Sequence, residues 1–159
     1  MVYSYQTGSA QDTFAFGQAL GCLLEPGDVL LLHGDLGTGK SVLSRGLARG
    51  AGIDEPMPSP TFTLMMAYEG RIPFYHMDLY RLSDPDEFFQ AGLQEQVGGD
   101  GAAVIEWPEC AELALDECLE FTLYRAEEED SRRIELTIHG FETRKDDLLD
   151  AIKKWRAAQ

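Results

Sequence analysis

The sequence predicts a three-layer α/β domain, with helices on both faces of a sheet that has a parallel core and antiparallel additions. Two short apolar runs, residues 28–33 and 102–107, have the composition of buried parallel strands. Residues 119–138 instead contain two segments in which apolar and polar positions alternate, as in antiparallel strands. A mixture of both strand types with helices indicates the layered α/β class. A length of 159 residues favours a single domain over residues 1–159.

The first part of the chain predicts strand, helix, strand and helix in that order. Residues 1–7 alternate loosely and predict a short strand, and residues 11–24 carry apolar side chains at helical spacing. Glu-Pro-Gly at residues 25–27 predicts a turn into the strand at 28–33. After a glycine-rich loop, apolar residues again recur at helical spacing until glycines at positions 50 and 52 supply a stop.

The middle of the chain predicts a connector, a hairpin and a helix. Residues 54–60 contain three prolines and predict a mobile connector. Residues 61–68 and 72–78 are rich in strand-forming side chains, with Glu-Gly at 69–70 as the turn between them. Acidic residues among positions 83–87 are typical of the first turn of a helix.

The last part of the chain predicts strands followed by a closing helix. A glycine-rich loop at residues 98–101 precedes the buried run 102–107. The two alternating segments of residues 119–138 flank the acidic run 127–130, which predicts an antiparallel hairpin with a charged tip. Apolar residues at helical spacing over 148–155 predict an amphipathic helix.

Residues 34–41, Gly-Asp-Leu-Gly-Thr-Gly-Lys-Ser, fit the phosphate-binding pattern G-x-x-x-x-G-K-[ST] between a predicted strand and a predicted helix. The glycines let several backbone N–H groups face one phosphate chain, and the helix N-terminus adds its dipole. We expect Lys40 to reach the β- and γ-phosphates and the Ser41 hydroxyl to bind Mg²⁺. The motif therefore predicts a P-loop NTPase-like fold, with the nucleotide at the carboxyl ends of the parallel strands.

A nucleotide hydrolase also needs an acid near Mg²⁺, at the end of a strand beside the loop strand. Glu106 near the end of the run 102–107 is the first candidate, and Asp78 is the second, for the metal or for positioning the attacking water. Each acid also suits an ordinary cap or ion pair at a strand end. His76 shares a strand face with Asp78, but without a third ligand it is better interpreted as a packed histidine. Trp107 is either a core residue or a neighbour of the nucleotide.

Ser-Pro-Thr at residues 59–61 has the placement of a switch segment, in which Thr61 senses the γ-phosphate and Mg²⁺. An ordinary turn entering a strand fits these residues equally well. Arg81, Arg132 and Arg133 are the arginines expected closest to a nucleotide, although each also suits a surface ion pair.

Composition limits the classes of partner. The net charge of −15 argues against independent high-affinity binding of tRNA or another nucleic acid, because phosphates need neutralising cations. No apolar run approaches the roughly 18 residues of a membrane span, and the N-terminus lacks the features of a signal peptide. Three cysteines without a CxxC pair favour reduced thiols, so we expect a cytoplasmic protein.

Four segments, in order, resemble the TsaE (YjeE-type) family of bacterial ATPases of tRNA threonylcarbamoyladenosine (t6A) synthesis. They are GDLGTGKS at 34–41, SPTFTL at 59–64, HMDLYRL at 76–82 and IEWP at 105–108. Many NTPases share the first motif, whereas the other three are far more specific. The resemblance spans most of residues 1–140.

The resemblance implies binding of ATP with Mg²⁺, weak hydrolysis stimulated by partners, and work with the TsaD and TsaB proteins in modifying position 37 of tRNA. The residues it implies for ATP are Thr13, Asp35, Leu36, Gly37, Thr38, Gly39, Lys40, Ser41, Val42 and Arg132, with Thr13 and Arg132 toward the base or ribose. It implies Ser41 and Glu106 at the metal, Lys40, Asp78 and Glu106 in catalysis, and Thr61 as switch-like. Ser41 stands where threonine is more usual, and its hydroxyl can do the same work.

Three other functions fit parts of the sequence. A small P-loop kinase fits the loop and the chain length, although the lid-like tip at 127–130 is dominated by acids. A GTPase would use an N-K-x-D element, and this chain contains no asparagine. A non-hydrolysing scaffold, in which ATP only orders the connector for docking, fits the same motifs as the ATPase.

Overall fold

The computed structural model describes residues 1–113 and 115–158, so the end of the predicted domain at residue 159 lies outside the described residues. The elements occur in the order β1 (Val2–Thr7), α1 (Ala10–Gly21), β2 (Val29–His33), α2 (Lys40–Gly50), β3 (Met65–Glu69), β4 (Pro73–Asp78), α3 (Asp86–Gln90), the 3₁₀ helix η1 (Leu93–Gln96), β5 (Ala102–Glu106), the 3₁₀ helix η2 (Pro108–Ala111), β6 (Cys118–Arg125), β7 (Arg132–His139) and α4 (Lys145–Ala157).

The strands form one seven-stranded sheet in the order β1-β7-β6-β2-β5-β4-β3. The central strands β6, β2, β5 and β4 pair in parallel. Antiparallel pairing joins β7 and β1 on one side and β3 on the other. The predicted parallel core with antiparallel additions is therefore confirmed, and the hairpin predicted over 119–138 joins the core because β6 also pairs with β2 in parallel.

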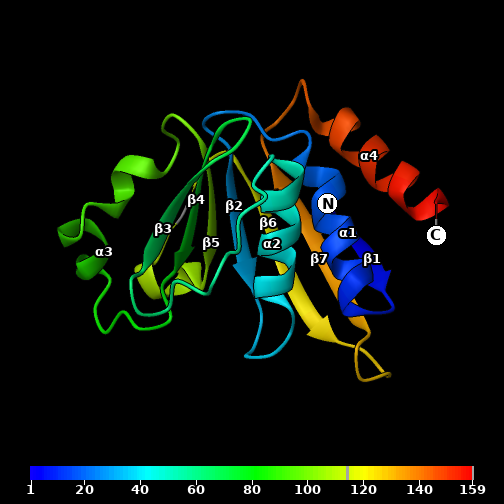
Figure 1. Ribbon diagram of the computed structural model, residues 1–159, viewed down its shortest axis with the longest axis horizontal. Coiled ribbons are helices and arrows are strands. Elements are labelled where there is room, and N and C mark those ends of the chain that lie inside the picture. Colours follow the sequence, from blue (N-terminus) through cyan, green and yellow to red (C-terminus); the bar gives the residue numbers. More distant parts are fainter. Residues whose placement is uncertain (114, 159) are drawn as a thin grey trace.

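Helices cover both faces of the sheet (Figure 1). Helices α1, α2 and α4 pack on one face, and the shorter α3, η1 and η2 lie on the other. Leu30 and Leu32 of β2 belong to the first core, whereas Val29 and Leu31 belong to the second, because successive side chains of a strand point to opposite faces. Burial on both faces explains why β2 is a continuous apolar run.

Helix α1 fixes the position of α2, which begins at the glycine-rich loop. The two helices approach so closely that a Cβ atom on Gly46 would collide with the carbonyl oxygen of Phe14, and one on Gly21 with that of Leu47. Only glycine permits this approach. The α1–α2 contact therefore determines where the N-terminus of α2 meets the sheet.

The strand predicted to begin at Thr61 begins at Met65, so that boundary was wrong. The N–H groups of Thr63 and Leu64 donate to the carbonyl of Pro60 over 3.2 and 2.7 Å, and Leu64 has a φ of 67°. This turn satisfies backbone hydrogen-bonding groups within residues 60–64, so this segment does not pair as part of β3. No helix in the described part of the chain is long and apolar enough to cross a membrane.

Candidate nucleotide-binding site

A cleft of about 360 Å³ lies at the carboxyl ends of β2, β4 and β5. It is lined by residues of the glycine-rich loop, the start of α2, the connector, two strand ends and the start of β7: Leu36, Gly37, Gly39, Lys40, Ser41, Val42, Ser59, Thr61, Asp78, Glu106, Trp107 and Arg132. The fold thus brings the phosphate motif, both predicted acids and the switch-like threonine into one cleft.

The loop between β2 and α2 adopts a conformation that depends on glycine. Gly34 has a φ of 142°, and a Cβ atom there would lie 2.7 Å from Thr38 Oγ1 and 2.8 Å from the Leu123 carbonyl oxygen. Gly39, directly before α2, has a φ of 101°. The Thr38 hydroxyl donates to the Asp35 carbonyl over 2.8 Å and closes the loop on itself. The loop therefore delivers the chain to a helix N-terminus, which is a favourable place for an anion.

Lys40 is held against the loop at the floor of the cleft. Its Nζ donates to the carbonyl oxygens of Gly34 and, over 2.9 Å, of Asp35, and lies 4.2 Å from the ring centroid of Trp107. Burial lowers the pKa of the Lys40 ammonium, while the carboxylate of Glu106 opposes that shift most strongly among the nearby acids. Trp107 adopts a left-handed backbone conformation with a φ of 57°, which is uncommon for a bulky residue and turns the chain at the end of β5.

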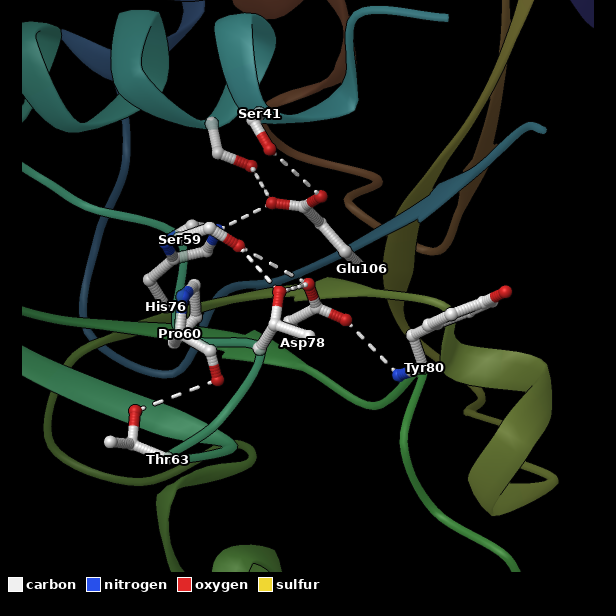
Figure 2. Close-up of polar contacts among 10 residues, drawn as sticks. Ser41, Ser59, Pro60, Thr63, His76, Asp78, Tyr80 and Glu106 are labelled. Atoms are coloured by element: carbon white, nitrogen blue, oxygen red, sulfur yellow. Dashed lines mark hydrogen bonds and ion pairs between the residues drawn. The ribbon is translucent and has the colours of Figure 1, made fainter. Parts of the chain in front are cut away.

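Glu106 lies where the sequence placed the metal acid, because β5 pairs directly with the loop strand β2. Its Oε1 accepts from the Ser41 hydroxyl at 3.4 Å, and its Oε2 from the Ser44 hydroxyl at 3.2 Å. The Nε2 of His76 lies 2.6 Å from the same Oε2 (Figure 2). His76 is buried, as expected of a packed histidine, but it also fixes Glu106 from the neighbouring strand.

Asp78 is paired in register with Glu106 on the adjacent strand β4. Its Oδ2 accepts from the hydroxyls of Thr61 at 2.9 Å and Ser59 at 3.4 Å, and its Oδ1 from the Tyr80 N–H at 3.0 Å (Figure 2). The connector is therefore fastened to Asp78, and the switch-like threonine contacts a predicted catalytic acid.

The oxygen-bearing side chains of the cleft suit a magnesium ion. The Ser41 hydroxyl and the carboxylates of Glu106 and Asp78 are the hard ligands that Mg²⁺ prefers. Across the described residues, no group of three or more His, Cys, Asp or Glu side chains is arranged to hold a metal. Because Mg²⁺ usually takes one or two carboxylates together with phosphate oxygens and waters, this donor set fits a magnesium-nucleotide complex.

Of the three arginines predicted near a nucleotide, one lies at the cleft. Arg132 lines it, whereas Arg81 stacks on Phe62 and Arg133 pairs with Glu135. Thr13 lines a small adjoining hollow of about 30 Å³, shared with Gly39, Val42, Asp130 and Arg132. Its hydroxyl is 2.7 Å from that of Thr7 and is therefore already engaged.

Two contacts of the site, made by Ser44 and Arg125, were not predicted from the sequence. Ser44 follows Ser41 by three residues, and that spacing places both on one face of α2, which could have indicated a second hydroxyl beside Glu106. Arg125 donates from Nη2 to the Leu36 carbonyl over 3.2 Å. No local pattern marks Arg125, because its contact depends on how the β6–β7 hairpin lies against the loop.

Comparisons with known proteins show the family of this chain. The sequence model of the family described as "Threonylcarbamoyl adenosine biosynthesis protein TsaE" matches residues 7–134. The tRNA threonylcarbamoyladenosine biosynthesis protein TsaE of Treponema pallidum is 52% identical over 101 residues, which cover 64% of this chain and 75% of that protein. The protein of the same name from Bacillus subtilis is 39% identical over 138 residues, or 86% of this chain and 85% of that protein.

The fold also matches a solved structure. The crystal structure of Bacillus subtilis YdiB aligns with a TM-score of 0.79 and 32% sequence identity, over 97% of this chain and 95% of that one. Because the family match spans most of the chain and the Bacillus subtilis relative is similar over nearly all of it, this chain belongs to the TsaE family.

Proposed function

We propose that this chain is one nucleotide-binding domain that binds ATP with Mg²⁺ and hydrolyses it slowly. The hydrolysis supports threonylcarbamoyladenosine modification of tRNA at position 37 in the cytoplasm, together with the TsaD and TsaB proteins, which stimulate it. Membership of the TsaE family and the names of the relatives support the pathway. With a net charge of −15, the chain leaves tRNA binding to its partners.

One observation carries the proposal. The phosphate loop places Lys40 and Ser41 in the same cleft as Glu106, whose carboxylate lies 3.4 Å from the Ser41 hydroxyl. A glycine-rich turn without a nucleotide role needs neither the buried lysine nor an acid on the next strand. Their convergence is the arrangement that phosphoryl transfer requires.

Each residue has a distinct task in this proposal. The loop N–H groups and the N-terminus of α2 bind the phosphates, and Lys40 adds a positive charge. Ser41 and Glu106 would hold Mg²⁺, which would supply positive charge to neutralise the phosphate oxygens. Asp78 accepts a hydrogen bond from the attacking water and orients it toward the γ-phosphate.

The test is ATP hydrolysis by the purified chain, alone and with TsaD and TsaB. We expect a rate that rises with the pair and falls at least about a hundredfold in Lys40→Ala, because that variant loses the cation beside the phosphates. Lys153→Ala on α4 removes the same charge far from the cleft and is expected to leave the rate unchanged. ATP binding and tRNA modification that both survive in Lys40→Ala would refute the proposal.

A scaffold that binds ATP without needing hydrolysis is the second candidate. The observation that favours it is the attachment of the connector to Asp78 through Thr61 and Ser59, because a nucleotide there can order the connector for docking. Asp78→Asn distinguishes the two functions. A variant that binds ATP, does not hydrolyse it and still supports modification would establish the scaffold.

A further inference from the structure

Two arginines flank the turn of the β6–β7 hairpin. Arg125 ends β6 and Arg132 begins β7, and the two are directly opposite in the antiparallel register. Figure 1 shows the hairpin tip and the loop between β2 and α2 at the same edge of the sheet. Both side chains extend from the hairpin onto the backbone of that loop.

Three successive carbonyl groups of the loop accept hydrogen bonds from these arginines. Arg125 Nη2 donates to the Leu36 carbonyl over 3.2 Å. Arg132 donates from Nη2 to the Gly37 carbonyl over 3.3 Å and from Nε to the Thr38 carbonyl over 2.9 Å. The hairpin therefore contacts the peptide planes that join residues 36 to 39.

The direction of these carbonyls determines the direction of the next N–H groups. In a planar trans peptide, the C=O of one residue and the N–H of the following residue point in opposite directions. Holding the carbonyls of residues 36–38 toward the hairpin therefore turns the N–H groups of Gly37, Thr38 and Gly39 the other way. Within the described residues, the N–H groups of Gly37 and Gly39 make no hydrogen bond to the chain, as donors meant for a ligand should, while Thr38 takes part in the turn at residues 36–37.

The contacts use the shape of the guanidinium group. The Nη1 of Arg132 also donates to the carbonyls of Glu129 and Ser131, over 2.7 and 2.8 Å, so this side chain links the hairpin tip to the loop through all three nitrogens. Arg125 packs directly on Gly37, where a Cβ atom would lie 2.6 Å from Nη2. A lysine ammonium is a single point of charge and cannot reproduce this fork.

We infer that Arg125 and Arg132 are positioning residues that hold the phosphate loop by its carbonyls, with its N–H groups facing the nucleotide phosphates. The inference rests on the proposed nucleotide binding at this loop. It gives Arg132 a task on the loop backbone, while the base or ribose contact that the resemblance implies stays a prediction, and it adds Arg125 to the site.

Arginine-to-lysine variants keep the positive charge, so they separate positioning of the loop backbone from simple electrostatic attraction to the phosphates. We expect Arg132→Lys to weaken ATP binding, measured by calorimetry, about tenfold and Arg125→Lys about threefold, because they lose two loop bonds and one loop bond respectively. Arg133→Lys is the matched control, since Arg133 is next in sequence but contacts Glu135 and the Tyr124 ring. We expect its affinity to stay within twofold of the original chain.

A second measurement needs no nucleotide. ¹⁵N relaxation of the Gly37, Thr38 and Gly39 amides in the nucleotide-free protein should show greater motion in Arg132→Lys and Arg125→Lys than in Arg133→Lys. If the original chain binds no ATP, the proposed function fails, while the relaxation data still decide whether the arginines order the loop. Unchanged relaxation, or ATP affinities equal to that of Arg133→Lys, would overturn the inference.

Discussion

The ends of β4 and β5 carry one carboxylate each, Asp78 and Glu106, paired in register and both buried in the same cleft. Their hydrogen-bond donors come from different kinds of structure. Glu106 accepts from Ser41, Ser44 and His76, which belong to α2 and β4. Asp78 accepts instead from the irregular connector and from the backbone just after its own strand.

This difference indicates two mechanical roles for the same functional group. A carboxylate held by a helix and a strand keeps its position when the cleft fills, which suits a metal ligand. A carboxylate fastened to an irregular segment couples any change in its own hydrogen bonds to that segment, which suits a residue that reports the state of the nucleotide. Substitutions of Glu106, of Asp78 and of the connector residue Thr61 test whether the two roles are separate.

Glu106→Gln is expected to have the largest effect. In the proposed function the Glu106 carboxylate would balance the charge of Mg²⁺, and the amide removes that charge, so hydrolysis should fall about a hundredfold or more. Binding of ATP measured without Mg²⁺ should not weaken, because a negative charge beside the phosphates has been removed. Glu95→Gln is the control, since Glu95 is an exposed residue of η1 that does not line the cleft. Hydrolysis within threefold of the original rate would contradict the metal role.

Asp78→Asn is expected to have an intermediate effect. An asparagine offers one neutral acceptor oxygen in place of two charged ones, which weakens the hydrogen bonds from the attacking water and from Thr61, so hydrolysis should fall about tenfold to a hundredfold. Affinity for ATP with Mg²⁺ should change little, whereas Glu106→Gln, which loses a proposed metal ligand, should weaken it. Asp84→Asn, which lies outside the cleft before α3, serves as the control. A loss of affinity as large as that of Glu106→Gln would show that the two acids share one role.

Thr61→Val is expected to have the smallest effect. It removes the hydrogen bond to the Asp78 carboxylate and the 2.7 Å contact with the Ser59 hydroxyl but keeps the side-chain shape, so hydrolysis should fall about threefold. Thr63→Val makes the same chemical change two residues away, where the hydroxyl contacts only the Pro60 carbonyl at 3.5 Å. Rates and melting temperatures of both variants should be measured together. Equal effects would mean that the Thr61 contact has no special role.

Much of the fold could be predicted because its signals are local. The continuous apolar runs of β2 and β5 indicated strands buried on both faces, and the structure confirms them as parallel neighbours. The start of β3 was placed wrongly because Leu64 takes a left-handed conformation that no sequence pattern signals. Strand order depends on how helices pack across the sheet, which periodicity alone cannot specify.

The site, like the fold, combines a local feature that the sequence predicts with contacts that only the folded chain makes. The spacing of residues 34–41 determined a phosphate loop by itself, because glycine positions and a following helix set the backbone direction over a few residues. Only the tertiary structure decided that His76 and Ser44 share Glu106, that Thr61 reaches Asp78, and that Arg125 lies behind the loop. These contacts join segments far apart in the chain. Their partners are set by strand register and by helix packing, which are properties of the folded whole.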